Sequence, residues 1–491
     1  MGSDRVVVIG AGLAGLSAAL RLAGAGREVL VLEASGGPGG VMGRWQAGGY
    51  TFDTGPTVLT MPELIDDALA AVGESRSDWL QLERLEPAYT AHYPDGTTLR
   101  SYADEEAMAA ELARVCGPAE AAGYRRLAAY LRRLYELEFD RFMDRNLDSV
   151  ADLAGLDALR LLRLGGLRGL DRVIGGYLAD DRARRLFTFQ ALYAGVSPVR
   201  ARALYAVISY LDSVAGVWFP RGGMHQVALA LAGAAARHGV TFGYRRRADR
   251  VEVSAGRVRA VITADGERLP AGAVIVTADL AASWAGLLPA ELRPRRLARW
   301  QHAPSALVWL VGSRGRLPEP AHHTISFGGE WAASFDRIIR RGELMADPSV
   351  LVTEATATDP ALAPAGRHAY YVLVPCPNLR RGRQDWDAIG EPYRAEIAAE
   401  LARRGLDADG AFSSGVEVSR LTTPADWQRQ GLTAGSPFGL AHTLRQTGPL
   451  RPATRHRSVP NLLFAGAACQ PGVGVPTVLL SGRLAASRLT G

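Results

Sequence analysis

The feature that most constrains the fold is a glycine-rich turn near the start of the chain. A β-branched run over Arg5–Ile9 predicts a strand, and the apolar segment Leu13–Ala25 predicts a helix. A second apolar strand is expected over Glu28–Leu32. Between the first strand and the helix stands the hexapeptide Gly10-Ala11-Gly12-Leu13-Ala14-Gly15. A strand, a GxGxxG turn and a helix in this order predict a dinucleotide-binding βαβ unit.

The glycines and a following acid have separate tasks in such a unit. Gly10 permits the tight turn, Gly12 lets backbone N–H groups approach a pyrophosphate, and Gly15 allows the helix to pack closely on the strand. Glu33, which precedes Ala34, ends the second strand, where its carboxylate can accept hydrogen bonds from ribose hydroxyls. A carboxylate at that place repels a 2′-phosphate, so NADP is disfavoured.

Two more glycine-rich regions extend the pattern. The doublet Gly39-Gly40, followed by Val41, comes shortly after the acid, and Phe52-Asp53-Thr54-Gly55-Pro56-Thr57 follows it. Near the C-terminus, a strand over Leu462–Ala465 leads through the turn Gly466–Gly474 into a helix expected over Thr477–Leu489. A strand, a glycine turn and a helix therefore occur at both ends of the chain.

In this order the segments resemble those of FAD-containing amine oxidases and carotenoid desaturases, and most closely the bacterial phytoene desaturase family. The similarity covers about residues 5–488. It continues through the middle of the chain in segments that include Phe189-Gln-Ala-Leu-Tyr-Ala-Gly195, Gly216-Val-Trp-Phe-Pro-Arg-Gly-Gly-Met224, His322-His323-Thr324, Tyr371-Val-Leu-Val-Pro-Cys-Pro377 and Gly435-Ser-Pro-Phe438.

The resemblance implies an α/β fold with a Rossmann-like FAD-binding domain of the GR2 type, a mixed-sheet substrate domain and a helical layer. It also implies that a helix N-terminus near the carboxyl end points at the pyrimidine edge of the flavin and stabilises the reduced anion. The resemblance implies FAD contacts by the turn Gly10–Gly15, by Glu33 and by Ala34. It implies further FAD contacts by Gly39, Gly40, Val41, Pro56, Thr57, Gly466, Ala467, Val475 and Pro476.

The chain departs from the family pattern at two places. Val41 stands where an arginine usually follows the doublet, and Arg44 comes three residues later. Ala468-Cys469-Gln470 replaces the usual Gly-Thr-His. We interpret Cys469 as a small packing residue, because no second cysteine is near it in the sequence.

A chain of 491 residues is too long for a single hydrophobic core, so two lobes are expected, one of them assembled from separated segments of the sequence. A hairpin with Asp95-Gly96 at its turn, a helix capped by Asp104 and a meander over Gly239–Thr277 mark changes of lobe, and Pro392–Arg404 predicts a later helix. We assign residues 1–78, 213–300 and 421–491 to the FAD-binding domain, 79–103 and 301–420 to the substrate domain, and 104–212 to the helical layer.

The implied activity is desaturation of a long apolar isoprenoid such as phytoene, in carotenoid biosynthesis. Hydride passes to flavin N5 and the electrons continue to a quinone or oxygen, because one dinucleotide fingerprint leaves no separate nicotinamide site. No catalytic base is identified. Asp152 is a speculative candidate, and the role of a helix N-cap or of a surface acid fits it better.

Composition excludes several other functions. All 56 basic residues are arginine, which rules out Schiff-base lysines and the lysine found beside the flavin in many amine oxidases. Cys116, Cys376 and Cys469 are far apart, so neither a disulfide framework nor a zinc site is predicted. The adjacent histidines lie on opposite sides of a strand without further ligands, and no metal is expected. The chain has no arginine-dense tract with interleaved aromatic residues, so nucleic-acid binding is not predicted.

We expect a cytoplasmic protein that associates peripherally with the membrane in which its substrate dissolves. Three alternatives stay open at this stage. A carotenoid isomerase or oxygenase of the same fold is compatible with Val41. A non-lysine amine oxidase would need an aromatic cage, and a prenyl-protein escort would bind isoprenoids without catalysis.

Overall fold

The structure is a computed structural model that describes residues 4–491. A parallel sheet in the order β19-β13-β1-β2-β9 forms the dinucleotide-binding lobe. Its inner strands are wholly buried, as expected for a parallel sheet that helices cover. The strands come from three separated parts of the chain: β1 (Val6–Ile9), β2 (Val29–Leu32), β9 (Thr241–Gly243), β13 (Ala273–Val276) and β19 (Leu462–Phe464). The predicted βαβ opening is confirmed.

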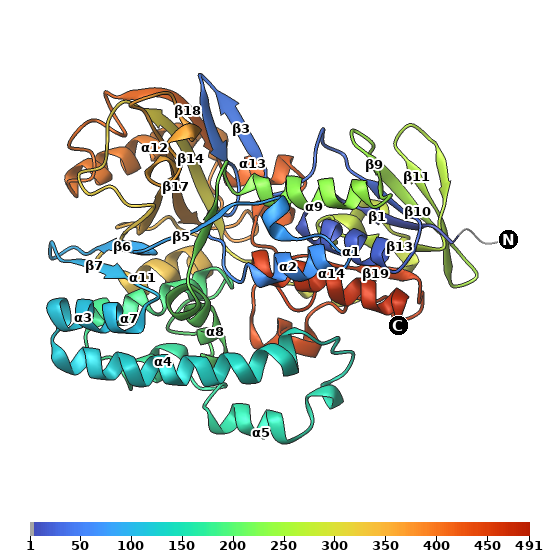
Figure 1. Ribbon diagram of the computed structural model, residues 1–491, viewed down its shortest axis with the longest axis horizontal. Coiled ribbons are helices and arrows are strands. Elements are labelled where there is room, and N and C mark those ends of the chain that lie inside the picture. The colour runs from blue at the N-terminus through green and yellow to red at the C-terminus, as the bar shows by residue number, and fades with distance from the viewer. Residues whose placement is uncertain (1–3) are drawn as a thin grey trace.

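Four helices pack around this sheet, and α1 is the centre of the group (Figure 1). The close approach of α1 and α14 depends on Gly482, because a Cβ there would overlap the carbonyl oxygen of Ala14. Ser17 donates a hydrogen bond to the carbonyl oxygen of Leu479 across the same contact (2.8 Å). The helices are α1 (Leu13–Gly24), α2 (Glu63–Ala70), α9 (His225–Arg237) and α14 (Val475–Thr490).

Smaller sheets decorate this lobe. The predicted meander is confirmed, and it projects beside the parallel sheet (Figure 1). Its strands are β10 (Ala248–Ser254), β11 (Arg257–Thr263) and β12 (Arg268–Pro270), and the short α10 (Leu280–Ala282) follows β13. Two strand pairs were not predicted: β3 (Arg44–Ala47) with β4 (Tyr50–Asp53), and β5 (Leu82–Arg84) with β8 (Trp218–Pro220).

A longer mixed sheet in the order β18-β14-β17-β16-β15-β6-β7 forms the second lobe. The predicted hairpin is confirmed, and its first strand pairs in parallel with β15, which comes more than 200 residues later. The strands are β6 (Tyr89–His92), β7 (Thr98–Ser101), β14 (Ser305–Ser313), β15 (His323–Ser326), β16 (Val350–Glu354), β17 (His368–Cys376) and β18 (Val416–Thr422). Its helices are α11 (Trp331–Asp336), α12 (Trp386–Arg403) and α13 (Pro424–Arg429).

The predicted start of one helix was wrong. We expected a helix to begin at Pro392, but α12 begins at Trp386, and Pro392 lies inside it. The side chain of Asp385 caps the true start by accepting a hydrogen bond from the Ala388 N–H group. The start of α12 is therefore set by the capping residue Asp385, which lies outside the amphipathic stretch on which the prediction was based.

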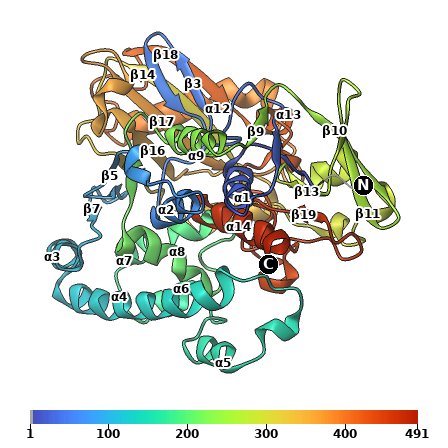
Figure 2. The ribbon, with the colours of Figure 1, turned by 45° about the vertical axis from the view of Figure 1, so that its right-hand side comes forward.

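Helices over residues 105–215 form a layer beneath the hairpin (Figure 2). Asp104 accepts a hydrogen bond from the Ala107 N–H group, so its predicted capping role is confirmed. The helices are α3 (Glu105–Cys116), α4 (Pro118–Glu138), α5 (Leu156–Arg163), α6 (Leu170–Ile174), α7 (Asp181–Leu186) and α8 (Ala206–Tyr210). The division of the whole chain into six domain segments stays a prediction.

Candidate functional site

The first turn of α1 leaves room for a ligand on one side. Gly10 has a φ of +110°, which favours glycine, and a Cβ on Gly15 would overlap the carbonyl oxygen of Gly10. At Gly12 a Cβ would meet no heavy atom within 4 Å. No side chain caps this helix start, so N–H groups of its first turn lack side-chain acceptors. This turn fits a pyrophosphate group.

Glu33 is held at the end of β2 beside that turn. One carboxylate oxygen accepts a hydrogen bond from the Ala11 N–H group (2.8 Å) and the other from the Ser35 N–H group (2.7 Å). Each oxygen keeps a further lone pair, so the carboxylate can still accept from a ribose hydroxyl. Ala34, next in the chain, is exposed.

The glycine doublet lies against the same turn. Gly39 donates a hydrogen bond to the carbonyl oxygen of Ala11 (2.9 Å), and a Cβ on Gly40 would come within 3.3 Å of the Cα of Gly12. Both glycines have positive φ. Val41 follows, and its carbonyl oxygen lies so close to Gly55 that a Cβ there would overlap it. The predicted residues of the first two segments are therefore neighbours in space.

The carboxyl-terminal segment passes beside the start of α1 and leads into a second uncapped helix start. Gly474 precedes α14 with a φ of +126°, and no side chain caps the helix start at Val475 and Pro476. A Cβ on Gly466 would come within 4.0 Å of the Cβ of Ala14. Two uncapped helix starts carry partial positive charge, which suits a cofactor with a pyrophosphate and an anionic reduced ring.

Arg451, which sequence reasoning missed, supports the loop before α14. Its side chain is fully buried and donates hydrogen bonds to four backbone carbonyl oxygens. Two of these belong to Ala467 and Cys469, in the loop itself, and burial lowers the pKa of the guanidinium to about 10. Cys469 is also buried, which agrees with its interpretation as a packing residue.

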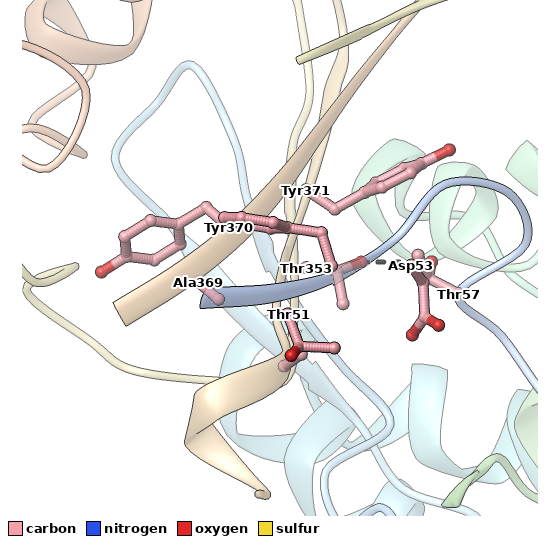
Figure 3. A pocket seen from close by; sticks show the side chains of 9 residues that line it. Thr51, Asp53, Thr57, Thr353, Ala369, Tyr370 and Tyr371 are labelled. Carbon is pink, nitrogen blue, oxygen red and sulfur yellow. Dashed lines mark hydrogen bonds between the residues drawn. The ribbon is translucent and has the colours of Figure 1, made fainter. Parts of the chain in front are cut away.

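A series of hydrogen-bonded, buried side chains links Thr57 to the second lobe. The hydroxyl of Thr353 donates to that of Thr57 (3.2 Å), and Nδ1 of His323 lies 2.9 Å from the Thr353 hydroxyl. Thr57 and Thr353 line a small pocket, with Pro56 preceding Thr57 in the chain (Figure 3). The full lining is Thr51, Phe52, Asp53, Thr57, Thr353, Ala355, Ala369, Tyr370 and Tyr371.

Asp53 in this pocket anchors α9. Its carboxylate accepts hydrogen bonds from the N–H groups of Met224 (2.8 Å) and His225 (3.1 Å). Burial raises its pKa to about 6, although these hydrogen bonds and the charge of Arg44 oppose the rise. The sequence indicated that the Phe52–Thr57 segment belongs to the cofactor region, but it did not predict that Asp53 holds the start of α9.

Asp152 and His322, considered from the sequence as a base and as part of a metal site, have hydrogen-bond partners within the protein. Asp152 is exposed and accepts hydrogen bonds from the N–H groups of Asp148 (2.7 Å) and Ser149 (2.8 Å). It is a surface acid, as one of the two interpretations had it, and the N-cap of the short helix is Ser149, with Asp152 as the other member of the capping box. His322 pairs with the hydroxyl of Thr358 at 2.7 Å. Within residues 4–491, no group of three or more His, Cys, Asp or Glu side chains is arranged to hold a metal ion.

Comparison with known proteins agrees with this geometry. A family described as flavin containing amine oxidoreductase matches residues 13–490. A phytoene dehydrogenase of Streptomyces griseus is 51% identical over 99% of this chain and 95% of its own. A zeta-carotene-forming phytoene desaturase of Myxococcus xanthus is 37% identical over 99% of this chain and 93% of its own.

Solved structures share the fold at lower identity. Cyclohexylamine oxidase from Brevibacterium oxydans has a TM-score of 0.62 at 17% identity, covering 100% of this chain and 99% of its own. RAB GDI from Plasmodium falciparum has a TM-score of 0.56 at 11% identity, covering 100% and 98%. The chain belongs to the flavin-containing amine oxidoreductase family, within its phytoene desaturase branch, and is an FAD-dependent oxidoreductase.

Proposed function

We propose that this enzyme desaturates a long apolar isoprenoid, phytoene or a related carotenoid precursor. The observation that carries the proposal is identity of 51% along nearly the whole chain with the phytoene dehydrogenase of Streptomyces griseus. FAD, when bound, supplies the acceptor for a hydride from an allylic C–H bond. The chain's own part is to hold that cofactor between two helix starts and to exclude water from the reacting carbons.

The proposed FAD contacts are the residues around those two helix starts. Their support is the open side of Gly12, the packing of the Gly39-Gly40 doublet on the first turn and the uncapped start of α14. The proposed contacts are Gly10, Ala11, Gly12, Leu13, Ala14, Gly15, Glu33, Ala34, Gly39, Gly40, Val41, Pro56, Thr57, Gly466, Ala467, Val475 and Pro476.

We further propose that electrons leave to a quinone or to oxygen without a nicotinamide cofactor. Flavin-loaded enzyme supplied with phytoene in liposomes and either acceptor is expected to form a product with longer-wavelength absorption and fewer hydrogens. An absolute requirement for NAD⁺ or NADP⁺ would contradict this proposal. A product with unchanged hydrogen count indicates an isomerase, and one that has gained oxygen indicates an oxygenase.

For membrane contact we propose the surface around α5, hereafter the α5 face. Among the described residues no helix is both long enough and apolar enough to span a bilayer. The α5 face exposes large apolar side chains, and α5 itself projects at the edge of the molecule (Figures 1 and 2). These side chains are Val150 (63% exposed), Leu156 (70%), Leu159 (52%), Leu162 (51%) and Leu167 (46%).

Charge on the α5 face favours an anionic lipid surface. Arg160 and Arg163 lie on the same short helix as Leu156, Leu159 and Leu162. Arg160 pairs there with Asp157 (2.8 Å), so the net positive charge of the helix is that of Arg163. Leucines spaced three residues apart on one side of a helix, with arginines beside them, match an interfacial membrane helix. An apolar isoprenoid would then reach the enzyme without crossing water.

The α5 face gives a direct binding prediction. Replacing Leu156, Leu159 and Leu162 together with serine removes most of the apolar area that enters the lipid, so liposome flotation is expected to fall at least roughly tenfold. The matched control replaces the same three leucines with methionine, which keeps an apolar side chain. Equal flotation of the serine and wild-type proteins with anionic vesicles at low salt would contradict the assignment.

A further inference from the structure

A short segment, residues 144–148, joins the helical layer to the dinucleotide-binding lobe, and we call it the strap. It follows the turn Phe139–Met143 at the end of α4 and leads to Val150, the first residue of the α5 face. Polar side chains of the strap bind the second half of α14. Their partners are Arg483 for Asp144, the carbonyl oxygen of Leu484 for Asn146 (3.1 Å), and Arg488 for Asp148 (2.8 Å).

Gln470, in the loop before α14, binds the middle of the strap. Its Oε1 atom accepts a hydrogen bond from the Leu147 N–H group (3.1 Å), and its Nε2 atom donates to the Leu147 carbonyl oxygen (2.7 Å). Nε2 also donates to the carbonyl oxygen of Gly448 (3.1 Å). Gln470 and Leu147 are each 2% exposed. The side-chain amide therefore pairs with both backbone groups of one residue and is shielded from water.

The loop carries proposed FAD contacts on both sides of Gln470. Ala467 lies three residues before it, and Val475 lies five residues after it. Apart from the thiol of Cys469, Gln470 has the one polar side chain in residues 466–474. Arg451 binds the carbonyl oxygens of Ala467 and Cys469, whereas Gln470 binds the loop to the strap and so to the helical layer.

The pairing with Leu147 depends on an amide at position 470. An amide presents its donor and its acceptor side by side, so both can reach the backbone of one residue. The histidine that the family usually has here carries its two nitrogens on diverging sides of the ring, so it would bond only one of these groups. The departure from the family pattern at Gln470 thus gives this chain a connection to the strap that a histidine would not provide.

We propose that Gln470 is a positioning residue for the desaturation, which rests on the function and the FAD contacts proposed above. Because it fixes the loop to the strap, it fixes the flavin relative to the helical layer and to an isoprenoid that arrives from the α5 face. Hydride transfer requires reacting atoms about 3–3.5 Å apart, and a displacement of about 1 Å can cost roughly 100-fold in rate. Gln470 acts through the backbone of its loop and does not take part in the chemistry.

The first test compares Gln470→Met with Asn461→Leu, which each replace a buried amide with an apolar side chain of similar size. Asn461 is the matched control, because its amide pairs with both backbone groups of Val258 (2.9 and 3.1 Å) and donates to Gly272 (2.8 Å). The two apoproteins are expected to lose similar stability in denaturant unfolding. In anaerobic rapid mixing with saturating phytoene, only Gln470→Met is expected to slow flavin reduction, at least roughly tenfold.

Two readouts do not depend on turnover. Exchange of the Leu147 N–H hydrogen in the apoprotein is expected to be faster in Gln470→Met and unchanged in Asn461→Leu, because only the first variant removes the acceptor. The visible circular dichroism of bound FAD, which reports the surroundings of the flavin ring, is expected to change in Gln470→Met alone. A side chain with a merely structural role would alter stability without altering this spectrum.

Gln470→Glu tests the pairing at nearly constant side-chain size. A protonated carboxyl group presents a donor beside an acceptor, as the amide does, whereas a carboxylate has no donor. Burial favours the protonated form, and the charge of Arg451, which binds the neighbouring Cys469, favours the ionised form. Relative to wild type at each pH, the rate of flavin reduction is expected to fall as pH rises and to reach the level of Gln470→Met at the alkaline end.

The outcomes separate the positioning role from the proposed function. If Gln470→Met reduces flavin at the rate of Asn461→Leu and keeps the wild-type flavin spectrum, the positioning role is wrong and the desaturase function stands. If Gln470→Met does not fold, a wild-type rate for Gln470→Glu at the alkaline end overturns the positioning role. If phytoene does not reduce the flavin of the wild type, the proposed function fails, and the flavin spectra of the variants still decide the role of Gln470.

Discussion

Gly12→Val is expected to abolish FAD retention while leaving the folded chain intact. No heavy atom lies within 4 Å of a Cβ at this position, so valine does not collide with the protein. It would instead occupy the side from which a pyrophosphate approaches the first turn of α1. We expect FAD affinity to fall at least roughly 100-fold, about 2.8 kcal/mol, measured by fluorescence titration of the apoprotein.

The control for this variant is Gly286→Val. Gly286 also has no heavy atom within 4 Å of a Cβ, but it lies in the segment Ser283–Leu287, apart from the two helix starts. Both apoproteins are expected to unfold near the wild-type temperature, because comparing them without FAD removes the stabilisation that ligand binding adds. A Gly12→Val protein that purifies with a full complement of FAD would disprove the placement of the pyrophosphate.

Arg451→Met is expected to lower the free energy of unfolding by roughly 2–4 kcal/mol, because four buried carbonyl oxygens lose their donor. Relief from burying a cation offsets part of this cost. Two of the carbonyls lie in the loop before α14, so FAD retention is expected to fall as well. Denaturant unfolding of the apoprotein measures the first effect, and flavin content the second.

Two further variants separate the geometry of Arg451 from its charge. Arg451→Lys keeps the charge, but an ammonium has three donors and cannot reproduce the planar fork of a guanidinium, so an intermediate loss is expected. Arg383→Met removes an exposed arginine and is expected to change stability by less than about 0.5 kcal/mol. If Arg451→Met is as stable as Arg383→Met, the four hydrogen bonds of Arg451 do not stabilise the fold.

Local patterns made the FAD side of the molecule predictable. The β1-α1-β2 unit and the segment from β19 into α14 each follow from strand and helix periodicity with glycine turns close by in sequence, and the hairpin β6-β7 of the second lobe was predictable in the same way. The return of the carboxyl-terminal segment to α1 was expected from family resemblance, since no local pattern brings Ala14 and Gly482 together. The packing of α14 on α1 depends on Gly482, whose role shows only in the folded chain.

The buried polar residues were not predictable because their roles arise from tertiary structure. Arg451 is one of 56 arginines, and nothing in its neighbourhood in the sequence marks it as buried. Gln470 lies in a loop, where an amide is usually solvated. Its partner Leu147 is 323 residues away in the sequence. The pairing of β6 with β15, which brings Tyr89 to His323, likewise spans more than 200 residues.

The central claim is that FAD held between α1 and α14 oxidises an apolar polyene directly. An anaerobic single turnover tests it: flavin-loaded enzyme is mixed with phytoene in liposomes, without nicotinamide, quinone or oxygen, and the visible spectrum is followed. We predict that the oxidised-flavin absorption bleaches while one double bond forms per flavin reduced. Flavin that stays oxidised until NAD⁺ or NADP⁺ is added, or a product with the hydrogen count of phytoene, would contradict the account.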